Sequence, residues 1–139
     1  MHHEVSVYRL AHFNSAHRLY RKDWSDEKNK AIFGLCANPH WHGHNYKIEV
    51  CVSGIVDTET GYLIDLKDLN QIIQDQVIER FDHRNLNEDT AEFRELNPTG
   101  ENIVRVIWEL IRAKLDNRFR LSVKLWETER NYFRFPAES

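Results

Sequence analysis

The chain has 139 residues, of which 41% are hydrophobic and 29% charged, with a formal net charge of -3 and two cysteines. This length is typical of one domain, so we interpret residues 1–139 as a single domain; the balanced charge argues against nucleic-acid binding by net charge, and two cysteines argue against a disulfide framework. Because no apolar run approaches the roughly 18 residues of a membrane span and the N-terminus lacks a signal-peptide core, we expect no membrane partner and a reducing, cytoplasmic setting.

Alternating apolar residues predict two strands in the first part of the chain, over residues 4–14 and 43–53. In the second strand the apolar side chains from Tyr46 to Val52 share one face. The polar stretch between the strands predicts a long loop with one short helix. Loops of that length in compact domains are usually functional or disordered.

The rest of the chain predicts two amphipathic helices and a hairpin. Apolar residues recur every three or four positions over 65–81, which Asp65 can cap, and over 100–115, which Thr99 can cap. The final segments "RLSVKLWET" and "NYFRF" alternate as two strands joined by a turn.

The order of these elements predicts an α+β fold, in which a four-stranded antiparallel sheet carries two helices on one face (ββααββ). We assign Phe13, Cys51 and Trp126 to the other face, where they would pack on another subunit. Cys51, in the middle of a strand, is interpreted as a small buried hydrophobic residue.

Residues 36–44, "CANPHWHGH", combine a thiol with three imidazoles. On an extended chain the spacing of His42 and His44 lets both rings reach one ion. His17 follows the first predicted strand and can join them, giving three imidazoles and an open position, as in catalytic zinc sites. His40 is a competing ligand in the loop.

The role of Cys36 stays open at this point. As a fourth ligand it would close a structural cage of the His3Cys type. Its offset from His42 across a loop that contains Pro39 instead suits a thiol beside the metal. The alternative interpretation of His42 and His44 is a pair of exposed or hydrogen-bonded histidines beside a loop.

Two further polar features are ambiguous by pattern. Asp82 and His83, in "FDHRNLN", are adjacent, so their side chains should diverge. The pattern favours a helix C-terminus with a cationic His83 over a carboxylate–imidazole pair that serves catalysis. Glu127, at the end of an alternating strand, is left unassigned.

Taken together, these segments resemble the 6-pyruvoyltetrahydropterin synthase and 6-carboxytetrahydropterin synthase family. The resemblance runs in order through "HFNSAHRL", "CANPHWHGHNY", "GYLIDLKDLN", "FDHRNLN", "PTGEN" and "ETERN". It implies that His17, His42 and His44 bind Zn²⁺, that His40 does not, and that Cys36 is the catalytic cysteine.

The resemblance also gives roles to the remaining polar residues. Asp82 and His83 would form a catalytic pair supplied by a neighbouring subunit, which replaces the interpretation from the pattern. Glu127 would anchor the pterin ring, and Thr99 and Glu101 would line the pterin pocket.

The implied fold is the tunnelling fold, in which three copies close their sheets into a barrel and two trimers stack as a hexamer. The implied substrate is 7,8-dihydroneopterin triphosphate. Elimination of triphosphate gives 6-pyruvoyltetrahydropterin, whereas a second branch also loses acetaldehyde and gives 6-carboxy-5,6,7,8-tetrahydropterin for queuosine biosynthesis. The spacing between Cys36 and His42 resembles the pyruvoyl branch.

Some positions are not settled by the resemblance. Arg18, Arg21 and Lys22 are candidates to help triphosphate leave, or else form a solvated basic loop. Gly100 stands where the family leads us to expect threonine, serine or alanine, and Trp41 replaces a small or polar residue. The rival classes are a non-catalytic structural zinc protein and an unrelated zinc hydrolase.

Overall fold

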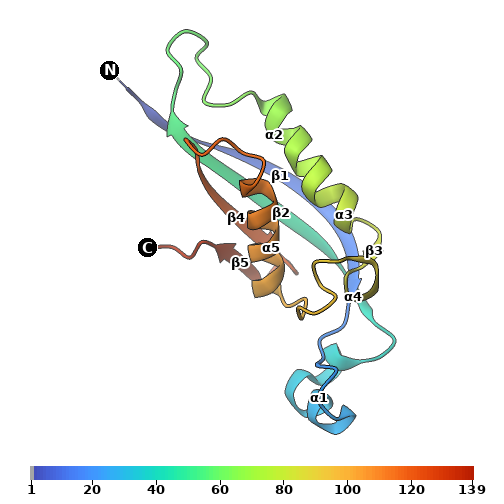
Figure 1. The fold of residues 1–139 in the computed structure, drawn as a ribbon. Coiled ribbons are helices and arrows are strands. Elements are labelled where there is room, and N and C mark those ends of the chain that lie inside the picture. The colour runs from blue at the N-terminus through green and yellow to red at the C-terminus, as the bar shows by residue number, and fades with distance from the viewer. Residues whose placement is uncertain (1) are drawn as a thin grey trace.

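Five strands form one sheet in the computed structural model, which describes residues 2–139 (Figure 1). In space they are ordered β3-β1-β2-β4-β5, and every neighbouring pair is antiparallel except β1 and β3. The predicted four-stranded antiparallel sheet is therefore confirmed, with a short parallel strand added at one edge. The strands are β1 (Glu4–His17), β2 (His42–Ile55), β3 (Arg84–Asn85), β4 (Arg120–Trp126) and β5 (Tyr132–Phe135).

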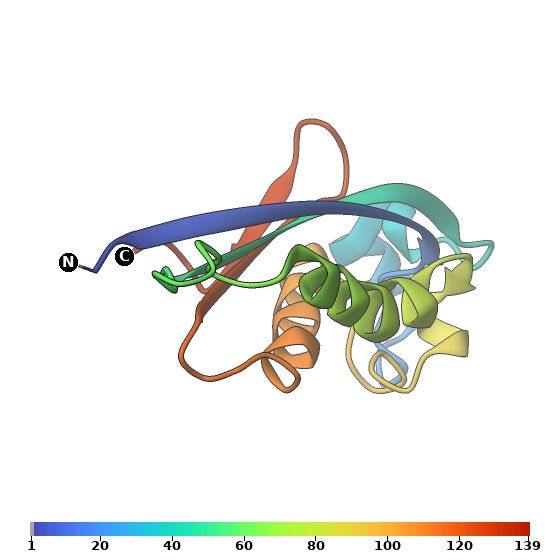
Figure 2. The ribbon, with the colours of Figure 1, turned by 90° about the horizontal axis from the view of Figure 1, so that it is seen from above.

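Both predicted long helices are present and lie on the same face of the sheet (Figure 2). The first is a continuous run in which a π-helical segment, η2, joins α2 to α3, and the second is α5. The loop after β1 contains the predicted short helix, α1. The helical elements are α1 (Asp26–Phe33), the 3-10 turn η1 (Gly34–Ala37), α2 (Leu66–Ile73), η2 (Gln74–Ile78), α3 (Glu79–Phe81), α4 (Leu86–Asp89) and α5 (Gly100–Arg112).

Side-chain caps set where the long helices begin. The carboxylate of Asp65 accepts a hydrogen bond from the Lys67 backbone N–H at 2.9 Å, and the Thr99 hydroxyl accepts one from the Asn102 N–H at 3.2 Å. These bonds satisfy N–H groups that have no partner within the helix. Both caps were predicted from the sequence.

The core lies between the helices and one face of the sheet. The apolar row of β2, from Tyr46 to Val52, is fully buried, as predicted. Phe13 belongs to the same layer, because it is 2% exposed and stacks on Tyr46 with ring centroids 5.0 Å apart. Its assignment to the outer face was wrong. The helices contribute Leu69, Ile73, Val77, Ile103, Ile107 and Ile111.

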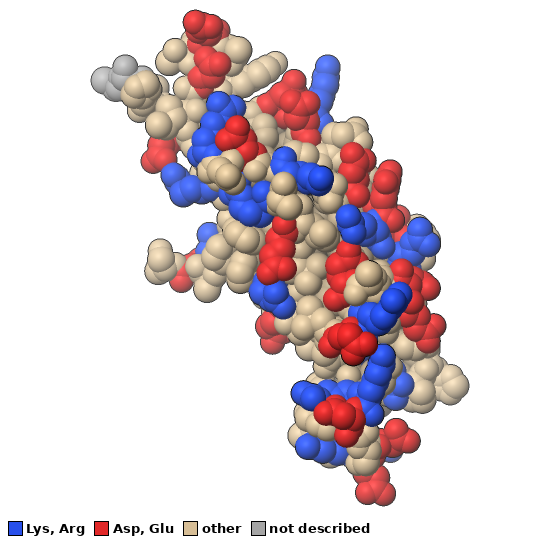
Figure 3. Space-filling model, viewed as in Figure 1, with Lys and Arg blue, Asp and Glu red and all other residues tan. Residues whose placement is uncertain are grey.

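The opposite face of the sheet has no helix over it in the described chain (Figure 2). Cys51 and Trp126 lie on this face, as predicted. The ring of Trp126 stacks on that of Tyr132, with the ring centroids 5.3 Å apart. Cys51 is half-buried between its cross-strand neighbours Tyr8 and Ser122, so its description as a buried hydrophobic residue was wrong. On the helix side, positive and negative side chains are interspersed (Figure 3).

Among residues 2–139, no helix combines the length and the apolar character that crossing a membrane requires.

Gly100, the unexpected glycine, is explained by Phe133. It opens α5 and is buried, and the aromatic ring of Phe133 on β5 occupies the space beside its Cα. A Cβ at position 100 would lie far inside the van der Waals distance of that ring. The small residue and the large one are therefore a matched pair that joins α5 to the C-terminal hairpin.

We expect Gly100→Ala to lower the free energy of unfolding by about 1–3 kcal/mol, because the new methyl group must displace the Phe133 ring. Urea denaturation at one protein concentration measures this loss. In a Phe133→Ala background the same substitution should cost nothing, since the space is then empty. Equal losses in the two backgrounds would contradict the matched-pair interpretation.

Candidate metal centre and active site

The three predicted metal ligands meet at the ends of β1 and β2. His17 lies directly opposite His42 in the antiparallel ladder, and His44 lies opposite Ser15. Side chains alternate along strands, so all three imidazoles project from the core face. One nitrogen from each ring lies within 4.8 Å of the others, and this histidine triad could hold a metal ion.

The surroundings of the triad prepare it for metal binding. The Nδ1–H of His17 donates to the backbone carbonyl of Pro98 at 2.8 Å, which leaves its Nε2 as an acceptor. Within residues 2–139, the buried Nε2 atoms of His17 and His44 have no hydrogen-bond partner. A carbonyl that fixes the tautomer and an unpaired nitrogen that faces inward are the features of a metal-binding histidine.

Burial keeps the imidazoles in the form that binds metals. It lowers the pKa of His17 to about 4, and it lowers the pKa of His42 and of His44 as well. At neutral pH the rings are therefore uncharged, and neutral imidazole is the ligand form. The donor set and its protonation fit zinc.

Cys36 is in the turn η1, close enough to Tyr46 to help raise the pKa of that residue, whose hydroxyl is 3.3 Å from Nδ1 of His17. Its thiol is free and half-buried, and it is outside the set of ligand atoms that lie within 4.8 Å of one another. The Leu19 backbone N–H donates to the Cys36 carbonyl at 2.7 Å and so ties the turn to the chain that follows His17. This placement favours a thiol next to the metal over the closed structural cage.

Glu127 approaches the triad from the end of β4. Its Oε1 is 4.0 Å from Nε2 of His44, and its backbone N–H donates to Asn131 at 3.1 Å in the tight β4–β5 hairpin. Burial raises the pKa of this carboxyl group, and the charge of Glu101 adds to the effect, while His42 opposes it. Glu101 and Glu127, both predicted to contact substrate, are therefore near each other.

Thr99 has a defined structural task besides its predicted contact with substrate. It precedes α5 and its hydroxyl oxygen accepts the Asn102 N–H. The same short segment supplies the carbonyl of Pro98 to His17 and places Glu101 in the first turn. One segment thus serves the triad on one side and the region of Glu127 on the other.

Asp82 and His83 are paired with each other, so the expectation that adjacent side chains diverge was wrong. The Nδ1 of His83 lies 2.9 Å from Oδ2 of Asp82. His83 has a φ of 58°, and this left-handed backbone turns its ring back toward the carboxylate. The Asn14 N–H donates to Asp82 Oδ1 at 2.8 Å, which lowers the pKa of that carboxyl group, with His83 assisting.

This pair lies at the edge of the sheet beside β1, where the His83 N–H donates to the Asn14 carbonyl at 2.6 Å. His83 is 79% exposed and lines a surface hollow of about 430 Å³, to which Ser15 and the triad residue His44 contribute as well as Asn14, Ala16 and Asn45. The last three alternate with the residues that face the core, and so they point away from it. Neither Asp82 nor His83 belongs to the group of converging ligand atoms, and the His83 ring is open to solvent.

The residues around His40 form a separate turn. His40 is exposed and outside the ligand set, and its N–H donates to Oδ1 of Asn38 at 2.9 Å. Trp41 has a φ of 65°, a conformation that bulky residues rarely adopt, and its N–H donates to the Asn38 carbonyl at 3.1 Å. The structure thus separates His40 from the three histidines that converge.

Two participants were missed at the level of sequence. Pro98 acts through its carbonyl, and a backbone group leaves no signal in the sequence. Tyr46 lies beneath the triad, with its hydroxyl 3.3 Å from Nδ1 of His17. Its pKa is raised, mainly by burial, with contributions from Glu127 and Cys36. The alternation His42, His44, Tyr46 could have indicated a shared face, but a buried tyrosine is usually read as core.

Comparison with known proteins identifies the family. Residues 6–138 match the family model described as 6-pyruvoyl tetrahydropterin synthase. The chain belongs to this family. It is therefore an enzyme of the tetrahydropterin synthase class, which are lyases that act on pterins.

Relatives within the 6-pyruvoyl tetrahydropterin synthase family cover almost the whole chain. The 6-pyruvoyl tetrahydrobiopterin synthase of Pongo abelii is 38% identical, over 97% of this chain and 93% of that protein. The structure of the Caenorhabditis elegans 6-pyruvoyl tetrahydropterin synthase superposes with a TM-score of 0.90 at 34% identity, covering 97% and 96% of the two chains. A dihydroneopterin monophosphate aldolase of Pyrococcus furiosus is 34% identical over 87% of each chain.

We expect His17→Ala to abolish stoichiometric metal binding and His40→Ala to leave it intact, because only His17 belongs to the triad. Metal content per chain, measured by plasma mass spectrometry after dialysis, tests this. His40 is the matched control, since it is an imidazole in the same region of the chain. Equal metal content in the two variants would refute the ligand assignment.

Proposed function

We propose that this chain is a zinc-dependent lyase that eliminates triphosphate from 7,8-dihydroneopterin triphosphate and gives 6-pyruvoyltetrahydropterin. The observation that carries the proposal is the histidine triad with inward-facing, unpaired nitrogens, set between a free thiol and a half-buried glutamate. The family provides the class of reaction, and near full-length relatives that carry the pyruvoyl name support this product.

His17, His42 and His44 would hold the zinc ion. When bound, zinc polarises the hydroxyl groups of the substrate side chain and makes the neighbouring C–H and O–H bonds more acidic. The protein contributes neutral rings in fixed positions. The Pro98 carbonyl orients one ring, and Tyr46 supports it from below.

Glu127 would recognise the pterin ring. A carboxylate can accept two parallel hydrogen bonds from neighbouring N–H groups of a pterin, which fixes both position and orientation. Its location at the end of β4, 4.0 Å from His44, would place the side chain of the substrate over the triad. Thr99 and Glu101 lie along the adjoining segment, where they would line the pocket.

Cys36 would move protons on the substrate side chain, since a thiolate is a suitable base and the turn η1 is tied to the chain just after His17. Asp82 and His83 would act with it from a neighbouring chain. Their position at the exposed edge of the sheet supports this arrangement, because within one chain they lie outside the group of converging ligand atoms.

Such a site requires an oligomer, and the sheet offers the means to form one. Within the described chain, β1 pairs with β3 only at Ser15 and Ala16, so most of its outer edge has no partner, and β5 forms the opposite edge. Edge strands of this kind pair with other chains. We propose a trimer that closes into a barrel, with two trimers stacked as a hexamer.

Two finer points complete the proposal. The alternative product is 6-carboxy-5,6,7,8-tetrahydropterin, which would place the enzyme on the queuosine route and would be recognised by release of acetaldehyde. A reducing cytoplasm is the setting we propose, supported by the two free cysteines, Cys36 and Cys51.

We expect Cys36→Ala to lose turnover of 7,8-dihydroneopterin triphosphate by at least about a hundredfold, as for removal of a general base, and to retain zinc at the wild-type level. Product analysis by chromatography and metal content by mass spectrometry give the two readings. Loss of both zinc and thermal stability would instead indicate the structural cage. If the zinc-loaded wild type gives carboxypterin and acetaldehyde, the pyruvoyl assignment is wrong.

Mixing two inactive variants tests whether neighbouring chains share a site. Cys36→Ala supplies an intact Asp82–His83 pair, and His83→Ala supplies an intact thiol. In co-expressed hybrid oligomers, random assembly should restore about a quarter of the wild-type activity, because each contact joins two different copies. If both groups act within one chain, the hybrids will stay as inactive as either parent.

A further inference from the structure

Arg18, the residue after His17, is held in place by its own chain. The Arg18 N–H donates to Oδ1 of Asn87, and Nδ2 of Asn87 donates back to the Arg18 carbonyl, both at 2.9 Å. Its Nε–H donates to the Ala37 carbonyl at 2.8 Å, and its guanidinium group lies 4.0 Å from the ring centre of Tyr20. Backbone and side chain are thus both fixed before any ligand arrives.

These contacts tie Arg18 to the thiol turn of the candidate active site. Arg18 directly follows His17 in the chain, and its guanidinium Nε–H is bonded to the residue that follows Cys36. The next residue, Leu19, donates its N–H to the Cys36 carbonyl at 2.7 Å. Residues 17–19 therefore supply a metal ligand, a cation and an anchor for the thiol turn in succession.

The charge of Arg18 is not neutralised within the described chain. Among residues 2–139, no carboxylate oxygen is within 4.0 Å of its guanidinium nitrogens, and its two Nη groups donate no hydrogen bond to protein. The side chain is half-buried, and these Nη groups are not sealed from solvent. They remain available to an anion.

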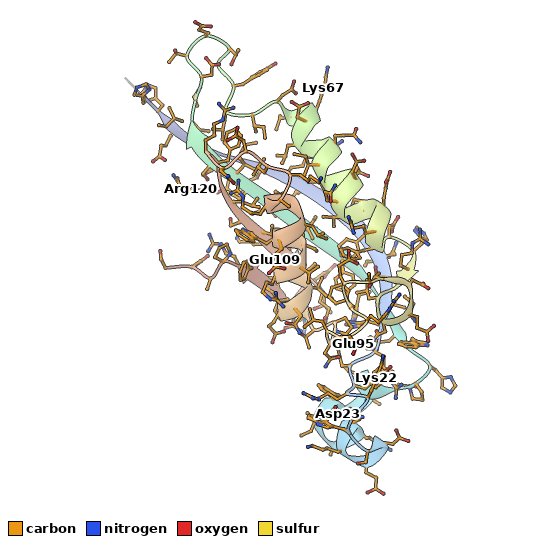
Figure 4. The ribbon with its side chains drawn as sticks, viewed as in Figure 1. Lys22, Asp23, Lys67, Glu95, Glu109 and Arg120 are labelled. Atoms are coloured by element: carbon orange, nitrogen blue, oxygen red, sulfur yellow. The ribbon has the colours of Figure 1, made fainter. Side chains whose placement is uncertain are left out.

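The other two basic candidates are differently placed. Arg21 forms an ion pair with Asp23, to whose carboxylate its Nε and Nη2 groups donate hydrogen bonds at 2.9 and 2.8 Å. Lys22 is exposed, and its Nζ donates at 3.4 Å to the carbonyl of Arg94. Lys22 and Asp23 lie at the junction between the α1 segment and the rest of the domain, in the same region as Glu95 (Figure 4).

We propose that Arg18 binds the triphosphate oxygens of the substrate. The inference rests on the proposed function and names the residue that takes the anionic end of the ligand. A guanidinium group offers paired N–H donors that match phosphate oxygens, and a fixed one binds without first losing its own freedom of motion. Since arginine stays charged throughout, Arg18 orients the leaving group and neutralises it without exchanging a proton.

Calorimetric titration of the zinc-loaded protein with inorganic triphosphate tests the proposal, with zinc content verified afterwards because triphosphate chelates zinc. Arg18→Gln should weaken binding by at least about tenfold, as loss of hydrogen bonds to a charged group does. Arg21→Gln is the matched control. It should change the affinity for triphosphate by less than about twofold, because Arg21 is engaged in an exposed ion pair with Asp23, and such a pair contributes little. Equal affinities in the two variants, or no binding by the wild type, would overturn the proposal.

A second measurement separates anion binding from support of the Cys36 turn. In a Cys36→Ala background, which should not turn over, the affinities for 7,8-dihydroneopterin triphosphate and 7,8-dihydroneopterin are compared. Arg18→Gln should reduce the first at least about tenfold and leave the second unchanged. A parallel loss of both would show a structural role and overturn the proposal. Arg18→Lys keeps the positive charge but lacks the paired N–H donors of the guanidinium group, so its affinity should lie between those of the wild type and of Arg18→Gln. It replaces the glutamine variant in this experiment if that variant does not fold.

The same data distinguish failure of this inference from failure of the proposed function. If the wild type binds the pterin triphosphate and Arg18→Gln changes nothing, the inference is wrong and the proposed function stands. If the wild type binds inorganic triphosphate through Arg18 but neither pterin, the anion site stands and the proposed substrate is wrong.

Discussion

The antiparallel register of β1 and β2 is the constraint on which the rest of the structure depends. It sets His17 of β1 opposite His42 of β2 and so brings a third imidazole to His42 and His44, which are two residues apart on β2. If the pairing of β1 with β2 shifted by one residue, the His17 side chain would point to the other face of the sheet and the triad would not form. The register is held away from the site, where Phe13 stacks on Tyr46 and the β2 row is fully buried, each side chain worth about 1.5–3 kcal/mol. The hydrophobic core thereby determines the geometry of the metal centre.

The Asp82–His83 pair is at the edge of the sheet, outside the group of atoms that forms the triad. The triad and Glu127 are near the core face, whereas the Asp82–His83 pair adjoins residues of the uncovered face. The pair is nevertheless rigid, because Asn14 on β1 binds it through both backbone groups: its N–H donates to Asp82, and its carbonyl accepts the His83 N–H at 2.6 Å. An exposed carboxylate–imidazole pair held at a strand edge is accessible to a neighbouring copy, as the proposed shared site requires.

Periodicity in the sequence was sufficient for both long helices, the four main strands and the spacing of the histidines, because each of these is a local pattern. What it missed depends on contacts between distant segments. The parallel strand β3 and the η2 π-turn leave no periodic signature, and the face of Phe13 is decided by packing on Tyr46. The roles of Asp82, His83 and Glu127 came only from family resemblance, since isolated polar residues carry no periodicity. The two hydrogen bonds that hold the Arg18 backbone likewise come from Asn87, a residue far along the chain.

The matched pair of Gly100 and Phe133 joins the hairpin that carries Glu127 to the segment that orients His17. Phe133 is on the hairpin that presents Glu127, and its ring packs against the first residue of α5. The segment just before that residue carries the Pro98 carbonyl that orients His17. A shift of the hairpin would therefore reach both Glu127 and the hydrogen bond that fixes the tautomer of His17. The family resemblance led us to expect a residue with a side chain at position 100, where this chain has glycine. The ring of Phe133, from the neighbouring strand, fills the space that this side chain would have occupied.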